Sequence, residues 1–150
     1  MRMFQALEAS ASALTAERLR MDVIANNLAN YRTTRTAEGG PYRRRVVVVE
    51  ERPNTTNTFA EALAREAGRP AEPGLGVRVR EIVEDPSPFK EVLDPTHPDA
   101  DPVTGIVRLP NVDLLQEITD LMLALRMYEA NLTALNAAKS MAMRALEIGR

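Results

Sequence analysis

The sequence predicts an α+β fold in which long N- and C-terminal helices pair as a coiled-coil-like bundle beside a small β-rich middle module. All ten prolines lie between Pro41 and Pro110, and six of the seven glycines lie between Gly39 and Gly105. Residues 1–38 and 111–148 contain neither proline nor glycine, so each of these segments can form a long helix. We therefore expect three parts: an N-terminal helix (1–32), a middle module (33–110) with a variable loop at 53–75, and a C-terminal helix (111–150).

The N-terminal segment carries the seven-residue apolar repeat that is typical of a coiled coil. Steps of three and four residues join Phe4, Leu7, Ala11, Leu14, Arg18, Met21, Ala25 and Leu28. Arg18 is the only polar residue in this row. The helix should end near Asn30, because the threonines that follow are poor helix formers and Gly39-Gly40-Pro41 forbids continuation.

The C-terminal segment repeats this pattern over a greater length. Its row consists of Leu114, Ile118, Leu121, Leu125, Tyr128, Leu132, Leu135, Lys139, Ala142 and Leu146, and Met143 widens it. Asp113 with Gln116 three residues later resembles a capping box, which marks a helix start. We therefore expect one helix from about Asp113 to Ile148, which at ~1.5 Å per residue is about 54 Å long.

The middle of the chain contains short runs of residues that favour strands. Val46–Val49 is a β-branched run, and a second candidate strand contains Val77, Val79 and the pair Ile82-Val83. Val92-Leu93 and Ile106-Val107 are further short candidates between turns rich in Pro and Asp. Between the first two runs, Thr58 and Glu61 could cap a short helix, although a loop fits the same residues equally well.

The composition limits the classes of partner. The 19 basic and 21 acidic side chains nearly balance, which argues against nucleic acid as the main partner. The chain has no cysteine, so disulfides, thiolate metal sites and cysteine nucleophiles are excluded. No cleavable signal peptide is evident, and no apolar stretch approaches the ~20 residues of a membrane span.

Two striped helices of this length cannot hide their apolar faces against a middle module of this size. Pairing with each other covers one side of each helix, and the remaining apolar surface is then available to neighbouring molecules. A monomeric helical hairpin that packs its own stripe is the alternative. The free subunit should have partly disordered ends that become ordered on assembly, because long helices gain most of their stability from packing.

We predict that an assembly interface runs along both helices. Its residues on the N-terminal side are Leu7, Leu14, Arg18, Met21, Asn26, Asn27, Leu28 and Asn30. On the C-terminal side they are Leu114, Ile118, Leu121, Leu125, Tyr128, Leu132, Leu135, Lys139, Met143 and Leu146.

The segment SALTAERLRMDVIANNLAN (12–30) is similar to the N-terminal signature of the flagellar rod, hook and hook-associated family. TTRTAEGGPYRR (33–44), DPTHPDAD (94–101), VRLPNVD (107–113) and the C-terminal segment 128–150 resemble proximal-rod members in particular. The resemblance implies a structural subunit of the proximal rod of the bacterial flagellar basal body. Its terminal helices would form the inner layer of a helical tube, the motor drive shaft.

The same resemblance implies the partners and the location. The partners are further copies of the chain, other proximal and distal rod proteins, and the flagellar type III export machinery. The rod lies in the periplasm and passes through peptidoglycan, and its subunits are exported without a cleaved signal peptide. The resemblance implies no cofactor and no small-molecule substrate.

Three polar groups each have two interpretations. Asp94, His97, Asp99 and Asp101 could bind a hard cation, but the prolines among them favour a plain acidic turn. Asn26, Asn27 and Asn30 could set the register between subunits, or they could end the helix in left-handed geometry. Arg43-Arg44-Arg45 is more consistent with solvated charge or a partner salt bridge than with phosphate binding.

The two charged residues within the apolar rows also have two interpretations. Arg18 and Lys139 either pair across subunits with acidic residues such as Glu17, Asp120 or Glu147, or extend to the surface along their aliphatic stems.

Three classes of function follow from these patterns. A structural rod subunit builds open-ended contacts, whereas a coiled-coil adaptor or an export-apparatus component of another secretion system forms a defined small oligomer. An enzyme requires convergent catalytic groups, and His97, the only histidine, has no nucleophile or second base beside it in the sequence. We therefore expect no catalytic site and no metal site.

Overall fold

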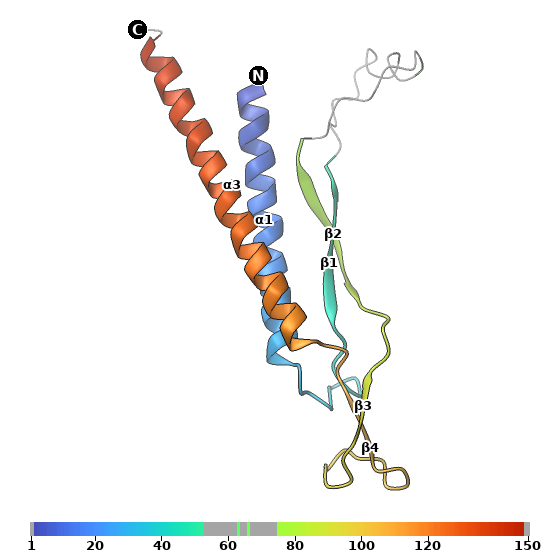
Figure 1. Cartoon of the computed structure of the whole chain (residues 1–150). Coiled ribbons are helices and arrows are strands. Elements are labelled where there is room, and N and C mark those ends of the chain that lie inside the picture. Colours follow the sequence, from blue (N-terminus) through green and yellow to red (C-terminus); the bar gives the residue numbers. More distant parts are fainter. Residues whose placement is uncertain (1, 53–62, 64–65, 67–74, 149–150) are drawn as a thin grey trace. The chain divides into compact units, whose positions relative to one another are not determined.

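The computed structural model describes residues 2–52, 63, 66 and 75–148, and its elements are labelled along the chain in Figure 1. In order these are α1 (Arg2–Ala29), β1 (Arg45–Glu51), β2 (Val77–Glu84), β3 (Lys90–Leu93), β4 (Ile106–Leu109) and α3 (Leu114–Ile148). The α+β class predicted from the sequence is therefore confirmed. The proposed cap at Thr58 and Glu61 lies outside the described residues.

Both terminal helices begin and end close to the residues that the sequence indicates. The Asp113 side chain caps α3, because its Oδ1 accepts hydrogen bonds from the main-chain N–H groups of Leu115 at 3.0 Å and Gln116 at 3.3 Å. At the end of α1, Asn30 Nδ2 donates to the carbonyl oxygen of Asn26 at 2.9 Å. No described residue other than glycine has a positive φ, so the left-handed ending considered for these asparagines is wrong.

The four predicted strands pair into two separate two-stranded sheets, β1 with β2 and β3 with β4. Main-chain hydrogen bonds from Arg52 N to Gly76 O and from Asp85 N to Arg44 O mark the two ends of the first, antiparallel sheet. In the second, Lys90 lies opposite Leu109 and Leu93 opposite Ile106. Each sheet is too small to be stable alone, so both depend on contacts with other elements.

The chain divides into two compact units, neither of which coincides with one of the three expected parts. Unit 1 comprises Met1–Glu17, Val49–Arg80 and Met127–Arg150, and unit 2 comprises Arg18–Val48 and Glu81–Arg126. The buried apolar side chains of unit 2 are Ile24, Tyr42, Val47, Val107, Val112 and Ala124. Those of the described part of unit 1 are Ala16 and Ala138.

In unit 1, α1 comes into direct contact with the start of β2. Ser12 Oγ donates to the carbonyl oxygen of Ala9 at 2.7 Å and accepts from the N–H of Val77 at 3.1 Å. Gly76 has a φ of +114°, and a Cβ there would lie 2.3 Å from Ser12 Oγ and 2.9 Å from Ala9 Cα. Only glycine allows this close approach of strand and helix.

No helix among the described residues has the length and apolarity needed to cross a membrane.

Candidate functional site

Helix α3 buries small or polar residues and exposes large apolar ones. Glu117, Ala124 and Ala138 are buried, at positions separated by multiples of seven residues. Ile118 and Leu125, each one position after a buried residue, and Leu132, one position after the half-buried Asn131, belong to the predicted apolar row and are 40%, 45% and 42% exposed. One residue corresponds to about 100° of rotation around a helix, so the exposed row forms a face of its own beside the buried one.

Further large apolar side chains widen this exposed face. Leu115 and Met122 are 75% and 63% exposed, and Leu114, Met143 and Leu146 are exposed as well. We call the exposed residues Leu114, Leu115, Ile118, Met122, Leu125, Leu132, Met143 and Leu146 the outer stripe of α3. Exposed apolar side chains gathered on one helix face are typical of interaction sites, although Glu129, Asn136 and Lys139 interrupt this stripe.

Helix α1 shows the same offset in a weaker form. Its buried residues are Ala16, Glu17, Ile24 and Asn27, whereas Leu7, Leu14, Met21 and Leu28 of the predicted row are half-buried. The predicted rows are therefore not the faces that the chain itself buries most completely.

The predicted interface residues fall into three groups by exposure. Exposed are Arg18, Asn26, Leu114, Ile118, Leu125, Leu132, Lys139, Met143 and Leu146. Half-buried are Leu7, Leu14, Met21, Leu28, Asn30, Leu121, Tyr128 and Leu135. Asn27 alone of the predicted set is buried, at 1% exposure, so its side chain serves contacts within its own subunit.

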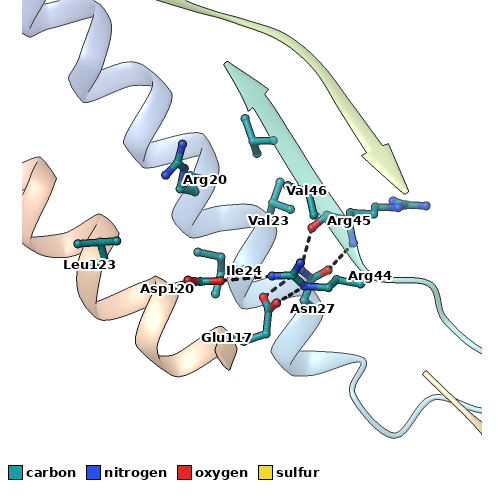
Figure 2. A pocket seen from close by; sticks show the side chains of 11 residues that line it. Arg20, Val23, Ile24, Asn27, Arg44, Arg45, Val46, Glu117, Asp120 and Leu123 are labelled. Carbon is teal, nitrogen blue, oxygen red and sulfur yellow. Dashed lines mark hydrogen bonds and ion pairs between the residues drawn. The ribbon is translucent and has the colours of Figure 1, made fainter. Parts of the chain in front are cut away.

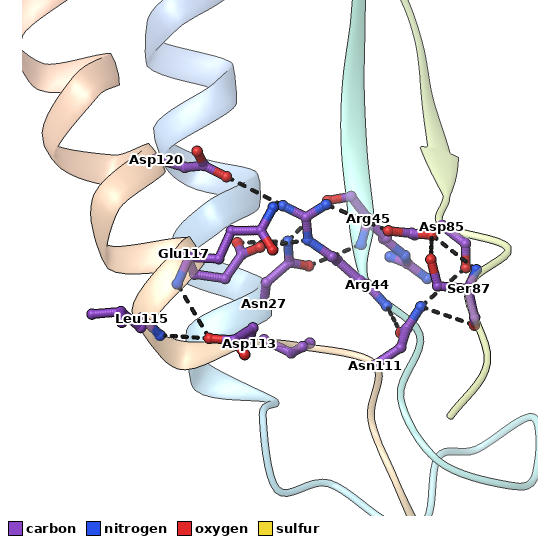
Figure 3. A network of polar contacts seen from close by, with 12 residues as sticks. Asn27, Arg44, Arg45, Asp85, Ser87, Asn111, Asp113, Leu115, Glu117 and Asp120 are labelled. Carbon is purple, nitrogen blue, oxygen red and sulfur yellow. Dashed lines mark hydrogen bonds and ion pairs between the residues drawn. The ribbon is translucent and has the colours of Figure 1, made fainter. Parts of the chain in front are cut away.

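Unit 2 contains a partly buried polar cluster centred on Arg44 (Figure 3). Its guanidinium pairs with three carboxylates, through Nε to Glu117 at 2.5 Å, Nη1 to Asp85 at 3.4 Å and Nη2 to Asp120 at 3.3 Å. Glu117 has no exposed surface, and the Arg44 side chain is 16% exposed. We call Asn27, Arg44, Asp85, Asn111, Glu117 and Asp120 the Arg44 cluster.

Two asparagine amides in this cluster hold the main chain at the start of β1. Asn27 Nδ2 donates to Arg45 O at 2.9 Å and Asn27 Oδ1 accepts from Arg45 N at 3.0 Å, as a neighbouring strand would. Asn27 Nδ2 also donates to Glu117 Oε2 at 3.0 Å, which joins α1 to α3. Asn111 Oδ1 accepts from Arg44 N at 2.8 Å, and its Nδ2 donates to Asp85 O at 3.1 Å.

The charges of the cluster support one another. Burial by itself lowers the pKa of Arg44, but hydrogen bonds and charge from Glu117 and Asp85 raise it above its ordinary value. Hydrogen bonds from the Ser87 side chain and main chain, followed by Arg44, lower the pKa of Asp85. Arg44 and Asp85 therefore each favour the charged form in the folded chain.

A cavity of about 220 Å³ lies beside the cluster in unit 2, lined by residues of α1, β1 and α3 (Figure 2). Its apolar wall includes Val23, Ile24 and Leu123, and its charged wall includes Arg44 and Asp120. These two charges already pair with each other. This ion pair joins the residue before β1 to α3. The residues that line the cavity present no free base or nucleophile.

The acidic loop after β3 uses its carboxylates for its own turns. Asp94 Oδ1 accepts from the N–H and hydroxyl of Thr96, and Asp101 Oδ1 accepts from the N–H of Val103. Asp99 accepts from the Thr34 hydroxyl at 2.7 Å. In the described part of the chain, no group of three or more His, Cys, Asp or Glu residues is arranged to hold a metal ion. The hydrogen bonds within the loop favour the plain acidic turn over a cation site.

The structure corrects the interpretation of the three arginines. Arg44 is neither solvated nor free for a partner, because it lies in the cluster. Arg43 donates to Asp85 O at 3.0 Å and lies over the Phe89 ring at 4.4 Å. Only Arg45 fits the expected solvated charge, with a long ion pair to Glu84 at 3.7 Å and a side chain 48% exposed.

Sequence reasoning missed Arg44, Asn111 and Glu117 as structural residues. One signal could have found Glu117: Glu117, Ala124, Asn131 and Ala138 form a heptad row of small or polar residues directly before the apolar row. Asp120, which was considered as a partner for another subunit, instead pairs with Arg44 of its own chain.

Comparison with known proteins identifies the family. The chain matches the family model described as "Flagella basal body rod protein" over residues 7–35 and "Flagellar basal body rod FlgEFG protein C-terminal" over residues 103–148. A flagellar basal-body rod protein FlgC of Bacillus subtilis is 48% identical over 151 residues, which covers 98% of each chain. The chain belongs to the FlgC family of flagellar basal-body rod proteins.

Two further FlgC relatives extend the comparison. The protein of Borreliella burgdorferi is 43% identical and covers 99% of this chain, and that of Salmonella typhimurium is 33% identical and covers all of it. The chain covers 98% and 100% of these two relatives. Membership of the FlgC family makes the chain a structural rod protein of the flagellar basal body, as the resemblance had implied.

Proposed function

We propose that this FlgC-family chain assembles helically with copies of itself and with other proximal and distal rod proteins, through its terminal helices, to form the motor drive shaft. The outer stripe of α3 and the half-buried row of α1 supply the contacts. The rod segment lies in the periplasm and crosses the peptidoglycan layer. The subunit reaches it through the flagellar type III export machinery without a cleaved signal peptide, and it has no catalytic role.

One observation carries this proposal. Helix α3 exposes Ile118, Leu125 and Leu132 while it buries Glu117, Ala124 and Ala138. Full burial of a large apolar side chain is worth roughly 1.5–3 kcal/mol, and these three are only partly buried, so an isolated subunit leaves part of that stabilisation unused. Heterologous contacts between neighbouring copies bury these side chains and extend without closing.

The experiment replaces two residues of the outer stripe in cells that lack the wild-type chain. The variant carries Leu125→Glu and Leu132→Glu, and the matched control carries Ala130→Glu and Ala137→Glu. The control positions are exposed, have the same seven-residue spacing and add the same charge on another face of α3. Basal bodies are isolated and probed for the chain, and swimming is measured.

The proposal predicts that the stripe variant is expressed, is missing from isolated basal bodies and does not support swimming, whereas the control is incorporated. Normal incorporation of the stripe variant would overturn the proposal. A closed small oligomer that both variants form equally would instead favour an adaptor.

A further inference from the structure

The Arg44 cluster joins segments of unit 2 that are far apart in the sequence. Asn27 comes from the end of α1, Arg44 from the residue before β1, and Asp85 from the residue after β2. Asn111 precedes α3, while Glu117 and Asp120 lie in its first turns. Figure 3 shows the three carboxylates around the guanidinium of Arg44, and the two asparagine side chains bonded to the neighbouring main chain.

The hydrogen bonds and ion pairs of the cluster each require a particular orientation of their two partners. The guanidinium of Arg44 is planar and uses three of its nitrogens on three different carboxylates. Asn27 fixes both the N–H and the carbonyl of Arg45, and Asn111 fixes the N–H of Arg44. A rotation of β1 relative to the two helices breaks several of these bonds together, whereas apolar packing tolerates small rotations.

Burial of the Arg44–Glu117 pair is not the simplest way to stabilise this site. The cost of removing two charges from water offsets much of their attraction, and apolar residues of similar volume often give equal stability. Glu117 is nevertheless completely buried, between Arg44 and Asn27. The neighbouring pair of Arg45 and Glu84 is exposed on both sides, so it has no comparable role.

We propose that Arg44, Glu117 and Asn27 are positioning residues, which fix the orientation of the β-rich segments on the two helices within unit 2. The expected effect of this positioning on assembly rests on the proposed function, because a rod subunit must present its helices and its middle segments to neighbours in one geometry. The orientation itself is a property of the single chain and is measured separately.

The test exploits the absence of cysteine, which allows two spin labels to be placed without background labelling. Cysteines replace Glu91 in β3 and Arg126 in α3, both exposed and both in unit 2. The distance between the labels is then measured by pulsed electron paramagnetic resonance in the full-length chain. The cluster variant carries Arg44→Met and Glu117→Leu, and the matched control carries Arg45→Met and Glu84→Leu.

The proposal predicts one narrow distance in the unsubstituted chain and in the control. In the cluster variant it predicts a broad or shifted distribution of distances between the labels. The variant should still fold, as shown by a cooperative thermal unfolding transition, but it should no longer be incorporated into basal bodies. A narrow, unshifted distance in a folded cluster variant would overturn it, as would a broad distance in the unsubstituted chain.

A second variant keeps the inference testable if the cluster variant fails to fold. Arg44→Lys retains the charge, but one ammonium group cannot hold three carboxylates in the same geometry. A broadened distance and reduced incorporation are expected, and an unchanged distance with normal incorporation would contradict the positioning role. Failure of the Leu125 and Leu132 experiment would affect only the proposed interface, so the two claims fail separately.

Discussion

At the scale of single residues, Asn26 and Asn27 are neighbours on one helix and have different roles, because one residue corresponds to about 100° of rotation. Both amides lie near the end of α1, but Asn26 is exposed and Asn27 is 1% exposed. The difference follows from position alone, because only Asn27 points toward β1 and α3, where it bonds to Arg45 and Glu117.

This contrast gives the first prediction. Asn27→Ala should lower the free energy of unfolding by roughly 2–4 kcal/mol, because it leaves the main-chain N–H and carbonyl of Arg45 without their partner and each costs about 1–3 kcal/mol. Asn26→Ala should change it by less than about 0.5 kcal/mol, since water replaces its contacts. Urea unfolding of both variants measures this, and equal losses would contradict the structure.

The second prediction concerns acid. The main-chain N–H groups of Gln116 and Leu115 lower the pKa of Asp113 below its ordinary value of 3.8, and hydrogen bonds from Ser87 do the same for Asp85. A lowered pKa contributes stability that is complete above the unfolded value and is lost as pH falls through the folded one. The urea midpoint should therefore drop as the pH falls below the ordinary value of 3.8 and through the lower pKa values of the folded chain.

Asp113→Asn provides the control for the acid prediction, because asparagine still accepts the capping bonds but has no carboxylate to titrate. The variant should show a shallower decline of the urea midpoint below about pH 4. An identical decline in both proteins would show that the cap does not contribute to acid sensitivity.

At the scale of elements, both terminal helices and all four strands could be predicted from the sequence. Proline placement, the β-branched runs and Asp113 gave boundaries close to those observed, because these signals are local. The heptad rows indicated the right helices, but they did not indicate which face each helix buries. The burial of Glu117 on α3 involves Arg44, which lies 73 residues earlier, and no local pattern reveals this pairing.

The third prediction tests the contact between α1 and the start of β2 in unit 1. Gly76→Ala should destabilise the chain by more than Gly39→Ala, which serves as the control. Both glycines have positive φ and share a strain cost of about 1–3 kcal/mol, but a Cβ at Gly39 meets nothing within 4 Å. Equal midpoints in thermal unfolding would show that the close approach to Ala9 and Ser12 is absent in solution.

The fourth prediction concerns local stability along the helices of the free subunit. Residues 18–29 and 114–126 adjoin the Arg44 cluster and the core of unit 2, whereas residues 127–148 bury Ala138 and expose Met141, Met143 and Leu146. Amide hydrogen exchange should therefore be slower in 18–29 and 114–126 than in 2–17 and 127–148.

Assembly should remove this difference, because neighbours then cover the outer stripe. Uniform protection along both helices in a dilute monomer would contradict the expectation that the ends become ordered on assembly.

At the scale of the whole molecule, the chain combines the hydrogen-bonded Arg44 cluster of unit 2 with exposed apolar side chains along α3. Apart from Asn27, the residues of the predicted interface are exposed or half-buried in the single chain, and their contacts with neighbouring subunits remain a prediction. The proposed function accounts for the large apolar side chains that the single chain leaves exposed, because contacts with neighbouring rod subunits would bury them.

The central claim, that the outer stripe of α3 contacts neighbouring rod subunits, is tested most directly by photo-crosslinking in assembled basal bodies. A photoreactive amino acid replaces Leu125 in one variant and Ala130, on another exposed face of α3, in the other. We predict that position 125 gives a covalent product with a second rod subunit and that position 130 gives little or none. No product from position 125 in basal bodies that contain the labelled chain would contradict the account.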